Sequence, residues 1–316
     1  MLGVGSLTNA SLTRWLRGLP GVDQVGAEAR AAGLGTRSLK STSKAWAIDT
    51  AISMIDLTTL EGADTDRTVR SLCAKAMAPD PGDPTTPQVA AVCIYADLVP
   101  VAVDALKNSN VQVAAVTSAF PSGRATMEVK LTDTLDALRA GADEIDMVID
   151  RAAFLSGRYL QVFSDITAIR QACDEEGTGN APAHLKVILE TGELATYDNV
   201  RRASWLAMLA GADFLKTSTG KVSPAATLPV TLILLEAVRD WHRLTGDQIG
   251  VKPAGGIRTT KDAMKYLVMV NEVTGEDWLD AAGFRFGASG LLNDLLLQRQ
   301  KLATGHYSGG DHVTID

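Results

Sequence analysis

The sequence predicts a single (β/α)8 barrel, the TIM-barrel architecture, preceded by an N-terminal extension. Short apolar, β-branched runs alternate eight times with stretches whose apolar residues recur every three and four positions, which is typical of strands alternating with helices. Eight is the number of strands at which a parallel sheet closes into a barrel. A doubly wound open sheet is the alternative. It would leave its outer strands as edges, whereas the first and last runs look as buried as the others.

Eight segments are expected to form the strands, and they cover 51–57, 90–95, 111–117, 144–149, 184–190, 213–217, 249–252 and 284–287. Helices are expected between them, for example over 132–138 and 194–210. The tripeptide Gly-Ala-Asp occurs at 141–143 and at 211–213, each time just before a strand. A glycine that ends a helix and a short turn into the next strand would have this form.

The chain of 316 residues is expected to hold one catalytic domain, since barrels of this kind have about 250 residues. Residues 1–46 are rich in Gly, Ala, Ser and Arg, and their periodicity is weak apart from a short helix near 11–17. We expect them to form a partly helical extension against the outside of the barrel, residues 47–303, with 304–316 as a tail. A small binding arm is the alternative for the extension.

The composition limits the class of partner. The net charge of −7 argues against a nucleic-acid surface, which needs a basic stripe. Three cysteines without CxxC spacing give neither a disulfide framework nor a zinc site, and suit a reducing cytoplasm. No apolar run approaches the roughly 20 residues of a membrane span. We therefore expect a soluble, cytoplasmic protein that acts on small molecules, without nucleic-acid or membrane partners.

Two lysines stand in segments that otherwise resemble buried strands ending in glycine-rich loops. They are Lys216 and Lys252, on the sixth and seventh predicted strands. A lone lysine of this kind would pair with a carboxylate or extend to the surface. Two of them at the loop ends of successive strands indicate instead an amine whose pKa is lowered for covalent chemistry.

Such an amine needs two sources of destabilisation for its charged form. Lowering an ordinary lysine to a pKa near 7 takes about 4.6 kcal/mol. Repulsion from a second lysine about 6 Å away supplies roughly 2.8 kcal/mol at an effective dielectric constant of about 20. Desolvation has to supply the rest. A neutral Lys216 would attack a carbonyl to form an iminium and then an enamine, which is class I aldolase chemistry and requires no metal or other cofactor.

This chemistry also needs a group that moves protons. Asp146, two strands before Lys216, is on an inward-facing position and is the best candidate, with Lys252 as its partner. The alternative is that Asp146 forms a buried ion pair with Lys186 on the neighbouring strand, and both contacts can exist together.

Glycine-rich loops after the last three strands predict a phosphate site. In barrels this site is commonly built from the loops after strands seven and eight with a helix N-terminus, where backbone N–H groups reach the anion. Polar residues at other strand ends face the same pocket. The expected substrate-binding residues are Gly220, Lys221, Gly255, Gly256, Gly287, Ser289, Thr58 and Cys93.

Six segments, in order along the chain, resemble the deoxyribose-phosphate aldolase family: 56–60, 144–149, 186–194, 216–221, 252–256 and 284–289. The resemblance implies reversible cleavage of 2-deoxy-D-ribose 5-phosphate to acetaldehyde and D-glyceraldehyde 3-phosphate. It implies that Lys216 forms the Schiff base, that Asp146 and Lys252 transfer protons, and that the glycine loops with Lys221 hold the phosphate. The chain has Gly290 where the family often has a hydroxyl residue and Ala225 where asparagine is common; Tyr307 could match the family's C-terminal tyrosine.

Other classes of function remain as alternatives. A metal-dependent aldolase or isomerase would need His or carboxylate clusters at strand ends, but the chain has four histidines and His184 is at the entrance of its strand. A Schiff-base aldolase for another sugar phosphate would share the site. A non-catalytic sugar-phosphate-binding barrel would keep Lys221 but has no need of the lysine pair. A homo-oligomer, dimer or larger, is expected, with Trp205 and Trp241 either at its contacts or packed on the barrel exterior.

Overall fold

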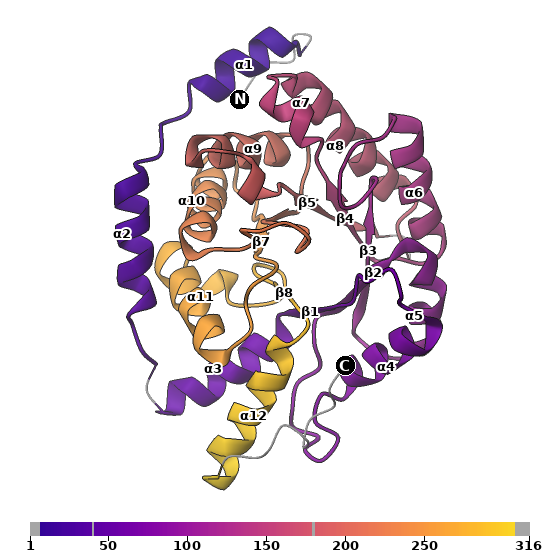
Figure 1. The fold of residues 1–316 in the computed structure, drawn as a ribbon, viewed down its shortest axis with the longest axis vertical. Helices are drawn as coiled ribbons and strands as arrows, with labels where there is room; N and C mark the ends of the chain where they lie inside the picture. The colour runs from indigo at the N-terminus through magenta and orange to yellow at the C-terminus, as the bar shows by residue number, and fades with distance from the viewer. Residues whose placement is uncertain (1–6, 40, 179–180, 307–316) are drawn as a thin grey trace.

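A computed structural model describes residues 7–39, 41–178 and 181–306, and its centre is a ring of eight parallel strands enclosed by helices (Figure 1). The strands are β1 (Ile55–Thr58), β2 (Ala91–Tyr95), β3 (Gln112–Thr117), β4 (Glu144–Val148), β5 (His184–Ile188), β6 (Phe214–Lys216), β7 (Gly250–Lys252) and β8 (Phe286–Ala288). The predicted (β/α)8 barrel is confirmed.

The strands pair in an order that closes the sheet almost completely. β1 to β7 pair consecutively, and β8 pairs with β1 rather than with β7. Between β7 and β8 there are two isolated parallel bridges, Val251 with Phe284 and Ala254 with Gly287. Backbone hydrogen bonds such as Arg285 N to Val251 O, 3.0 Å, complete this junction. The open-sheet alternative is therefore wrong, because every strand has neighbours on both sides.

The predicted first strand begins too early. Residues 51–53 are not strand but the last turn of a helix, α3 (Ser41–Ser53), and β1 starts at Ile55. Ala51 and Ile52 are fully buried, as are the β1 residues, so the run is apolar throughout. A short apolar run fits a buried strand and the end of a buried helix equally well.

The helices of the barrel layer follow the strands. They are α4 (Asp66–Met77), α5 (Val99–Ala105), α6 (Met127–Arg139), α7 (Arg151–Leu155), α8 (Tyr159–Glu175), α9 (Tyr197–Leu209), α10 (Leu228–Thr245), α11 (Thr260–Val273) and α12 (Leu291–Thr304), with single 3₁₀ turns at 96–98, 191–193 and 276–278. Among the described helices, none is long and apolar enough to cross a membrane.

A threonine precedes each of five of these helices, and its hydroxyl accepts the N–H of the residue three positions later. The five are Thr65, Thr126, Thr196, Thr227 and Thr259. Each satisfies one backbone donor that has no partner within the helix. The helix predicted from residue 194 therefore begins only at Tyr197, after its cap.

The two Gly-Ala-Asp segments have the predicted role. Gly141 and Gly211 have φ of +103° and +98°, where a glycine avoids steric strain. The aspartates that follow accept a backbone N–H from the preceding strand: Asp143 from Val113 N, 2.9 Å, and Asp213 from Leu185 N, 2.7 Å. In both copies of the tripeptide, the glycine follows the end of a helix and the aspartate links two neighbouring strands by a hydrogen bond.

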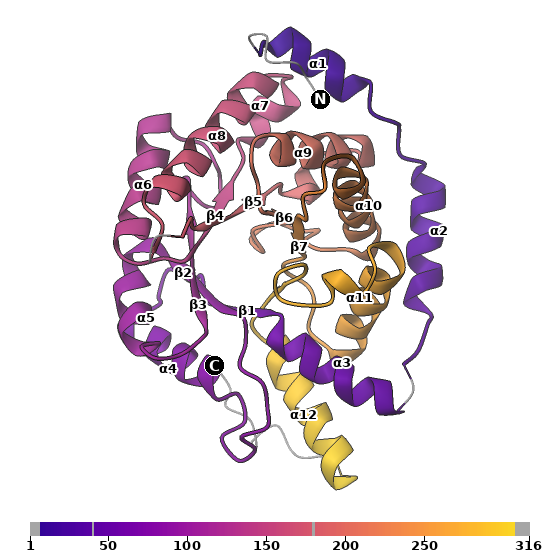
Figure 2. The same ribbon diagram turned by 180° about the vertical axis from the view of Figure 1, so that it is seen from behind.

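The N-terminal helices lie outside the barrel layer. Figures 1 and 2 show α1 (Asn9–Arg17) at one end of the molecule and α2 (Gln24–Gly35) along its flank. α1 contacts α8 and α9, and α2 contacts α10 and α11. Trp205 packs edge-on between Trp15 of α1 and Trp241 of α10, with ring centroids 6.0 and 5.7 Å away. Both tryptophans named as possible oligomer contacts thus pack within the chain.

Candidate active site

Two lysine side chains lie next to each other inside the barrel. Lys216 is the last residue of β6, Lys252 is the last residue of β7, and their Cα atoms are partners in the sheet register. Both residues are buried, with 2% and 0% of their surface exposed. A buried ammonium needs a compensating partner.

Asp146 provides that partner for both amines. Its Oδ2 accepts hydrogen bonds from Lys216 Nζ at 2.7 Å and from Lys252 Nζ at 2.8 Å. Cys93 Sγ lies 3.7 Å from the same oxygen. The other oxygen, Oδ1, forms an ion pair with Lys186 Nζ at 3.2 Å. Asp146 therefore contacts Lys216 and Lys252 and forms the ion pair with Lys186 at once, as the sequence allowed.

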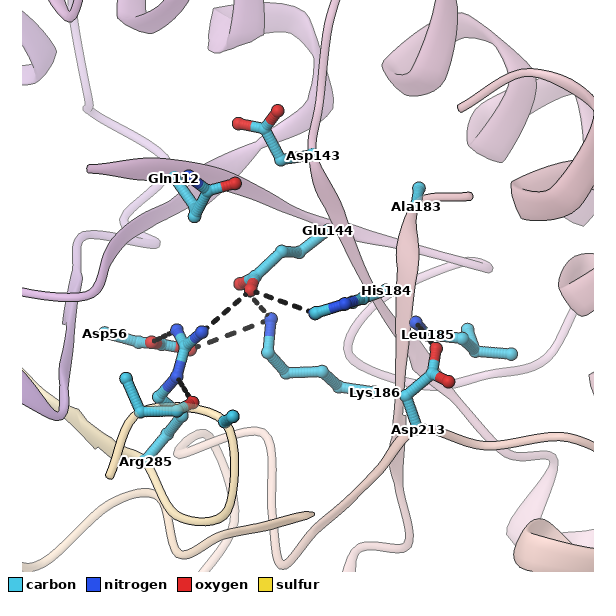
Figure 3. Close-up of polar contacts among 12 residues, drawn as sticks. Asp56, Gln112, Asp143, Glu144, Ala183, His184, Leu185, Lys186, Asp213 and Arg285 are labelled. Carbon is cyan, nitrogen blue, oxygen red and sulfur yellow. Dashed lines mark hydrogen bonds and ion pairs between the residues drawn. The ribbon is translucent and has the colours of Figure 1, made fainter. Parts of the chain in front are cut away.

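A second tier of charges lies deeper in the barrel (Figure 3). The Lys186 amine contacts a Glu144 oxygen, and Arg285 donates to Glu144 Oε1 at 3.0 Å and to Asp56 Oδ1 at 2.7 Å. Asp56 Oδ2 in turn lies 2.5 Å from Lys252 Nζ, so this second group of charges is connected to the lysine pair. At the strand entrance, His184 Nδ1 lies 3.7 Å from Glu144.

The ion pairs keep these groups charged despite their burial. Burial alone would raise the pKa of Asp146, but Lys186, Lys216 and Lys252 together hold it well below its usual value. Burial would lower the pKa of Lys252, yet Asp146 and Asp56 hold it well above its usual value. Both carboxylates thus favour the ammonium form of Lys252.

The interior carries one more cation than it has carboxylates. Asp56, Glu144 and Asp146 provide three negative charges, whereas Lys186, Lys216, Lys252 and Arg285 provide up to four positive ones. Since an unbalanced charge is costly in a medium of low dielectric constant, the loss of one proton from this cluster would balance it. Lys216 is the lysine with one carboxylate partner, while Lys186 has three and Lys252 has two.

The loops after β6 and β7 approach each other closely above these lysines. Gly220, Gly255 and Gly256 have φ of +77°, +78° and +85°. A Cβ atom on Gly255 would lie 3.2 Å from Gly220 Cα and 2.8 Å from the Ala225 side chain. A Cβ on Gly287 of β8 would lie 2.7 Å from Ala254 Cβ and 3.2 Å from Lys252 Cε. The glycines predicted to bind substrate are thus brought together, and only glycine fits at Gly255 and Gly287.

The other predicted binding residues belong to β1, β2 and the loops after β6 and β8. Lys221 is exposed and pairs with Glu61 of the loop after β1, Nζ to Oε1 2.8 Å. Ser289 is exposed just before α12, which begins after Gly290 without a side-chain cap. Thr58 ends β1 beside Cys93, and its hydroxyl donates to Asp56 O at 2.8 Å.

Sequence reasoning gave part of the cluster no catalytic or binding role. Asp56, Glu144 and Arg285 lie among the buried charges, but none of them was a predicted catalytic or substrate-binding residue. A usable signal existed for Glu144, because it precedes Asp146 by two positions and must point to the same face of its strand. Tyr307, proposed from the resemblance as a tail residue that reaches the site, lies outside the described residues.

The histidines and carboxylates do not form a metal-binding group within the described part of the chain, where no three His, Cys, Asp or Glu residues are arranged to hold an ion. His184 is the first residue of β5 and its side chain is 56% exposed at the strand entrance. The residues in the interior are instead arranged as alternating cations and carboxylates.

Comparisons with known proteins agree with this architecture. A family model described as DeoC/LacD family aldolase matches residues 50–295. The chain is 43% identical over 283 residues to the Homo sapiens protein named deoxyribose-phosphate aldolase, covering 85% of each.

Two solved structures have the same fold. One is a Coccidioides immitis protein provisionally named deoxyribose-phosphate aldolase, with 30% identity, a TM-score of 0.68, and coverage of 92% of this chain and 99% of that one. The other is a tetrameric deoxyribose phosphate aldolase from Aeropyrum pernix, with 24% identity, a TM-score of 0.60, and coverage of 84% and 98%. The family match spans most of the chain and includes every strand of the barrel, so this chain belongs to the DeoC/LacD family of aldolases.

Proposed function

We propose that this chain reversibly cleaves 2-deoxy-D-ribose 5-phosphate to acetaldehyde and D-glyceraldehyde 3-phosphate, with Lys216 as the Schiff-base nucleophile. The observation that carries the proposal is the contact of Asp146 Oδ2 with both Lys216 Nζ and Lys252 Nζ, at 2.7 and 2.8 Å. One carboxylate oxygen can therefore exchange protons with the nucleophile and with a neighbouring ammonium group. The Homo sapiens relative carries the name of this activity.

The reaction proceeds in four balanced steps. The neutral Lys216 amine adds to the C1 carbonyl of the open-chain sugar, and the carbinolamine loses water to give an iminium. A base removes the proton of the C3 hydroxyl while the C2–C3 bond breaks, which releases D-glyceraldehyde 3-phosphate and leaves an enamine. Protonation of the enamine carbon gives the acetaldehyde iminium, and water then releases acetaldehyde and the free amine. Asp146 and Lys252 move these protons, directly or through a water.

The phosphate is held by the loops after β6, β7 and β8. The space beside Gly220 and Gly256 is open, so their backbone N–H groups can face the phosphate, and Lys221 adds a positive charge. Gly255 contributes the close approach of its loop, since its own N–H donates to Gly287 O at 3.3 Å. Ser289 and the uncapped start of α12 complete the site on the β8 side. Gly287 allows Lys252 to pass close to the backbone, and Thr58 and Cys93 lie side by side on the next two strands, β1 and β2.

The same reasoning favours further properties of the protein. We infer that it acts in the cytoplasm, because its three cysteines are buried and unpaired.

We also infer a homo-oligomer of at least two subunits, as the Aeropyrum pernix relative is tetrameric. Light scattering after size-exclusion chromatography measures this mass directly, and a monomer at micromolar concentration would contradict it.

Reductive trapping tests the nucleophile. Incubation with acetaldehyde and borohydride is expected to leave a two-carbon adduct on Lys216, because borohydride reduces the iminium to a stable secondary amine. Peptide mass mapping locates the adduct. No adduct, or one on Lys186, overturns the assignment.

Two controls accompany the trapping experiment. Lys252→Met removes a buried cation beside the nucleophile, so trapping and turnover should both slow by about a hundredfold or more. Lys107→Met makes the same change at an exposed lysine, whose side chain is 69% exposed, and should alter neither. A separate test addresses the alternative functions. Adding EDTA should leave turnover unchanged, and a large loss of turnover would favour a metal-dependent aldolase. Binding of the sugar phosphate without any turnover would favour a non-catalytic sugar-phosphate-binding barrel.

A further inference from the structure

We propose that Glu144 and Arg285, which lie below the reactive lysines, are positioning residues that set the charge of the barrel interior and thereby the pH at which Lys216 becomes a nucleophile. The proposal rests on the proposed Schiff-base function of Lys216. It assigns a role to an ion network whose members are at the entrance ends of their strands: Glu144 is the first residue of β4, and Arg285 precedes the first residue of β8.

Two short paths connect this tier to Lys216. In the first, Glu144 contacts the Lys186 amine (Figure 3). Lys186 Nζ lies 3.2 Å from Asp146 Oδ1, and the second oxygen of Asp146 binds Lys216. In the second, Arg285 binds Asp56 Oδ1 at 2.7 Å, and Asp56 Oδ2 contacts Lys252, which also binds Asp146. Both paths end on the carboxylate that contacts the proposed nucleophile.

The titratable groups around Lys216 come from several strands of the barrel and belong to this ion network or contact it. The titratable groups that face this interior are Asp56 of β1, Cys93 of β2, Glu144 and Asp146 of β4, His184 and Lys186 of β5, Lys252 of β7 and Arg285 before β8. Burial raises the pKa of the Cys93 thiol, which keeps it neutral. Since Arg285 is always charged and Glu144 is ionised, these two residues contribute fixed charges of opposite sign.

Fixed charges act strongly here because the network is buried. Glu144 and Arg285 are 2% and 5% exposed, and their mutual contact of 3.0 Å is isolated from the screening of bulk water. Removing the negative charge should make the Lys216 amine release its proton more readily. Removing the positive charge should make the amine retain its proton. A loss of packing would not shift the pH dependence in opposite directions for the Glu144 and Arg285 variants.

The experiment compares the acid side of the pH profile of kcat/KM for the cleavage of 2-deoxy-D-ribose 5-phosphate. Glu144→Gln should move this limb to lower pH, and Arg285→Met should move it to higher pH, each by about half a pH unit to one pH unit. The double variant restores the net charge, so its limb should return to within about 0.3 pH units of the unaltered enzyme. Arg285→Lys keeps the charge and should also leave the limb in place.

Folding is monitored by the thermal melting of each variant. Should a single variant fail to fold, His184→Glu adds a negative charge next to Glu144 at a side chain that is 56% exposed, and it should move the limb to higher pH. Limbs that coincide for all folded variants, or that move in the same direction for both single variants, overturn the proposal. Failure of the Schiff-base function is a separate result, since it would show as an absence of trapping on Lys216 in the unaltered enzyme.

Discussion

At the scale of single residues, the structure adds a carboxylate that the sequence estimate left out. That estimate of the lysine pKa considered repulsion between two lysines and desolvation. Asp146 was expected to shuttle protons or to pair with Lys186, and its attraction for Lys216 was not included. Asp146 Oδ2 in fact contacts both amines, so it stabilises positive charge at the place where the nucleophile has to lose it. A single carboxylate therefore contacts two lysines, and Lys252 pairs in addition with Asp56.

A second residue-scale feature concerns Lys221, which the sequence predicted as a phosphate ligand. Its amine pairs with Glu61 from the loop after β1, and both side chains are partly or largely exposed, at 32% and 74%. Exposed pairs of this kind are weak, so a phosphate dianion can replace the glutamate. Nothing in the local sequence predicts this contact, because the partners are separated by 160 positions.

Glu61 should therefore compete with the substrate for Lys221. We expect Glu61→Gln to lower KM for 2-deoxy-D-ribose 5-phosphate about two- to five-fold, the range that corresponds to an exposed ion pair. The KM for unphosphorylated 2-deoxyribose should not change, because that sugar brings no charge to the loop. Steady-state kinetics on the two sugars measures the difference. Equal changes for both substrates would contradict competition at the phosphate site.

At the scale of elements, the strands that build the site were predicted better than the helix that precedes them. Strand parity places Asp146 and Glu144 on one face of β4 and His184 and Lys186 on one face of β5, since side chains alternate along a strand. The register that sets Asp146 opposite Lys186 was not accessible, because a closed barrel fixes it through the stagger of all eight strands. The end of α3 was missed because its apolar residues resemble those of β1.

The N-terminal helix α1 provides an element-scale prediction. Leu16 of α1 is fully buried, so Leu16→Ala should lower the free energy of unfolding by about 3 kcal/mol, from lost transfer free energy and the cavity left behind. The kcat at 25 °C should be unchanged, because α1 packs on α8 and α9 outside the barrel.

Urea unfolding followed by circular dichroism measures this loss. Leu244→Ala is the matched control, since that leucine is 69% exposed and its truncation should change stability by less than about 0.5 kcal/mol. Equal stabilities for the two variants would indicate that the extension is a loosely held binding arm.

At the scale of the whole molecule, the apolar core and the charged interior occupy different places. The apolar residues fill the layer between strands and helices, as the alternating sequence pattern predicts. Within the described residues, the space inside the ring instead holds a cluster of buried acidic and basic side chains: Asp56, Glu144, Asp146, Lys186, Lys216, Lys252 and Arg285. The sequence indicated a polar pocket from the strand ends, but the contacts within it connect residues up to 229 positions apart. Those pairings depend on closure of the barrel, which no local pattern contains.

The charged interior makes stability depend on acid in a predictable direction. Burial alone would raise the pKa of Asp56, Glu144 and Asp146, yet the surrounding lysines and Arg285 lower all three below their usual values. A carboxyl whose pKa is lowered by folding stabilises the native state above its unfolded pKa, and this contribution is lost as the pH falls towards its folded pKa. We therefore expect the free energy of unfolding to fall as the pH decreases from about 5 to about 3.

Glu144→Gln provides the quantitative form of this prediction. One lowered carboxyl contributes a slope of up to about 1.4 kcal/mol per pH unit between its folded and unfolded pKa values, because one proton is taken up on unfolding. The variant lacks that proton uptake, so its stability near pH 3 should decline with a slope shallower by about this amount, whatever its stability at neutral pH. Urea denaturation at half-unit pH intervals gives both slopes. Burial raises the pKa of Glu190 in the opposite sense, but that carboxyl is present in both proteins and cancels in the difference. Parallel slopes would mean that Glu144 is not held ionised by Lys186 and Arg285 in the folded protein.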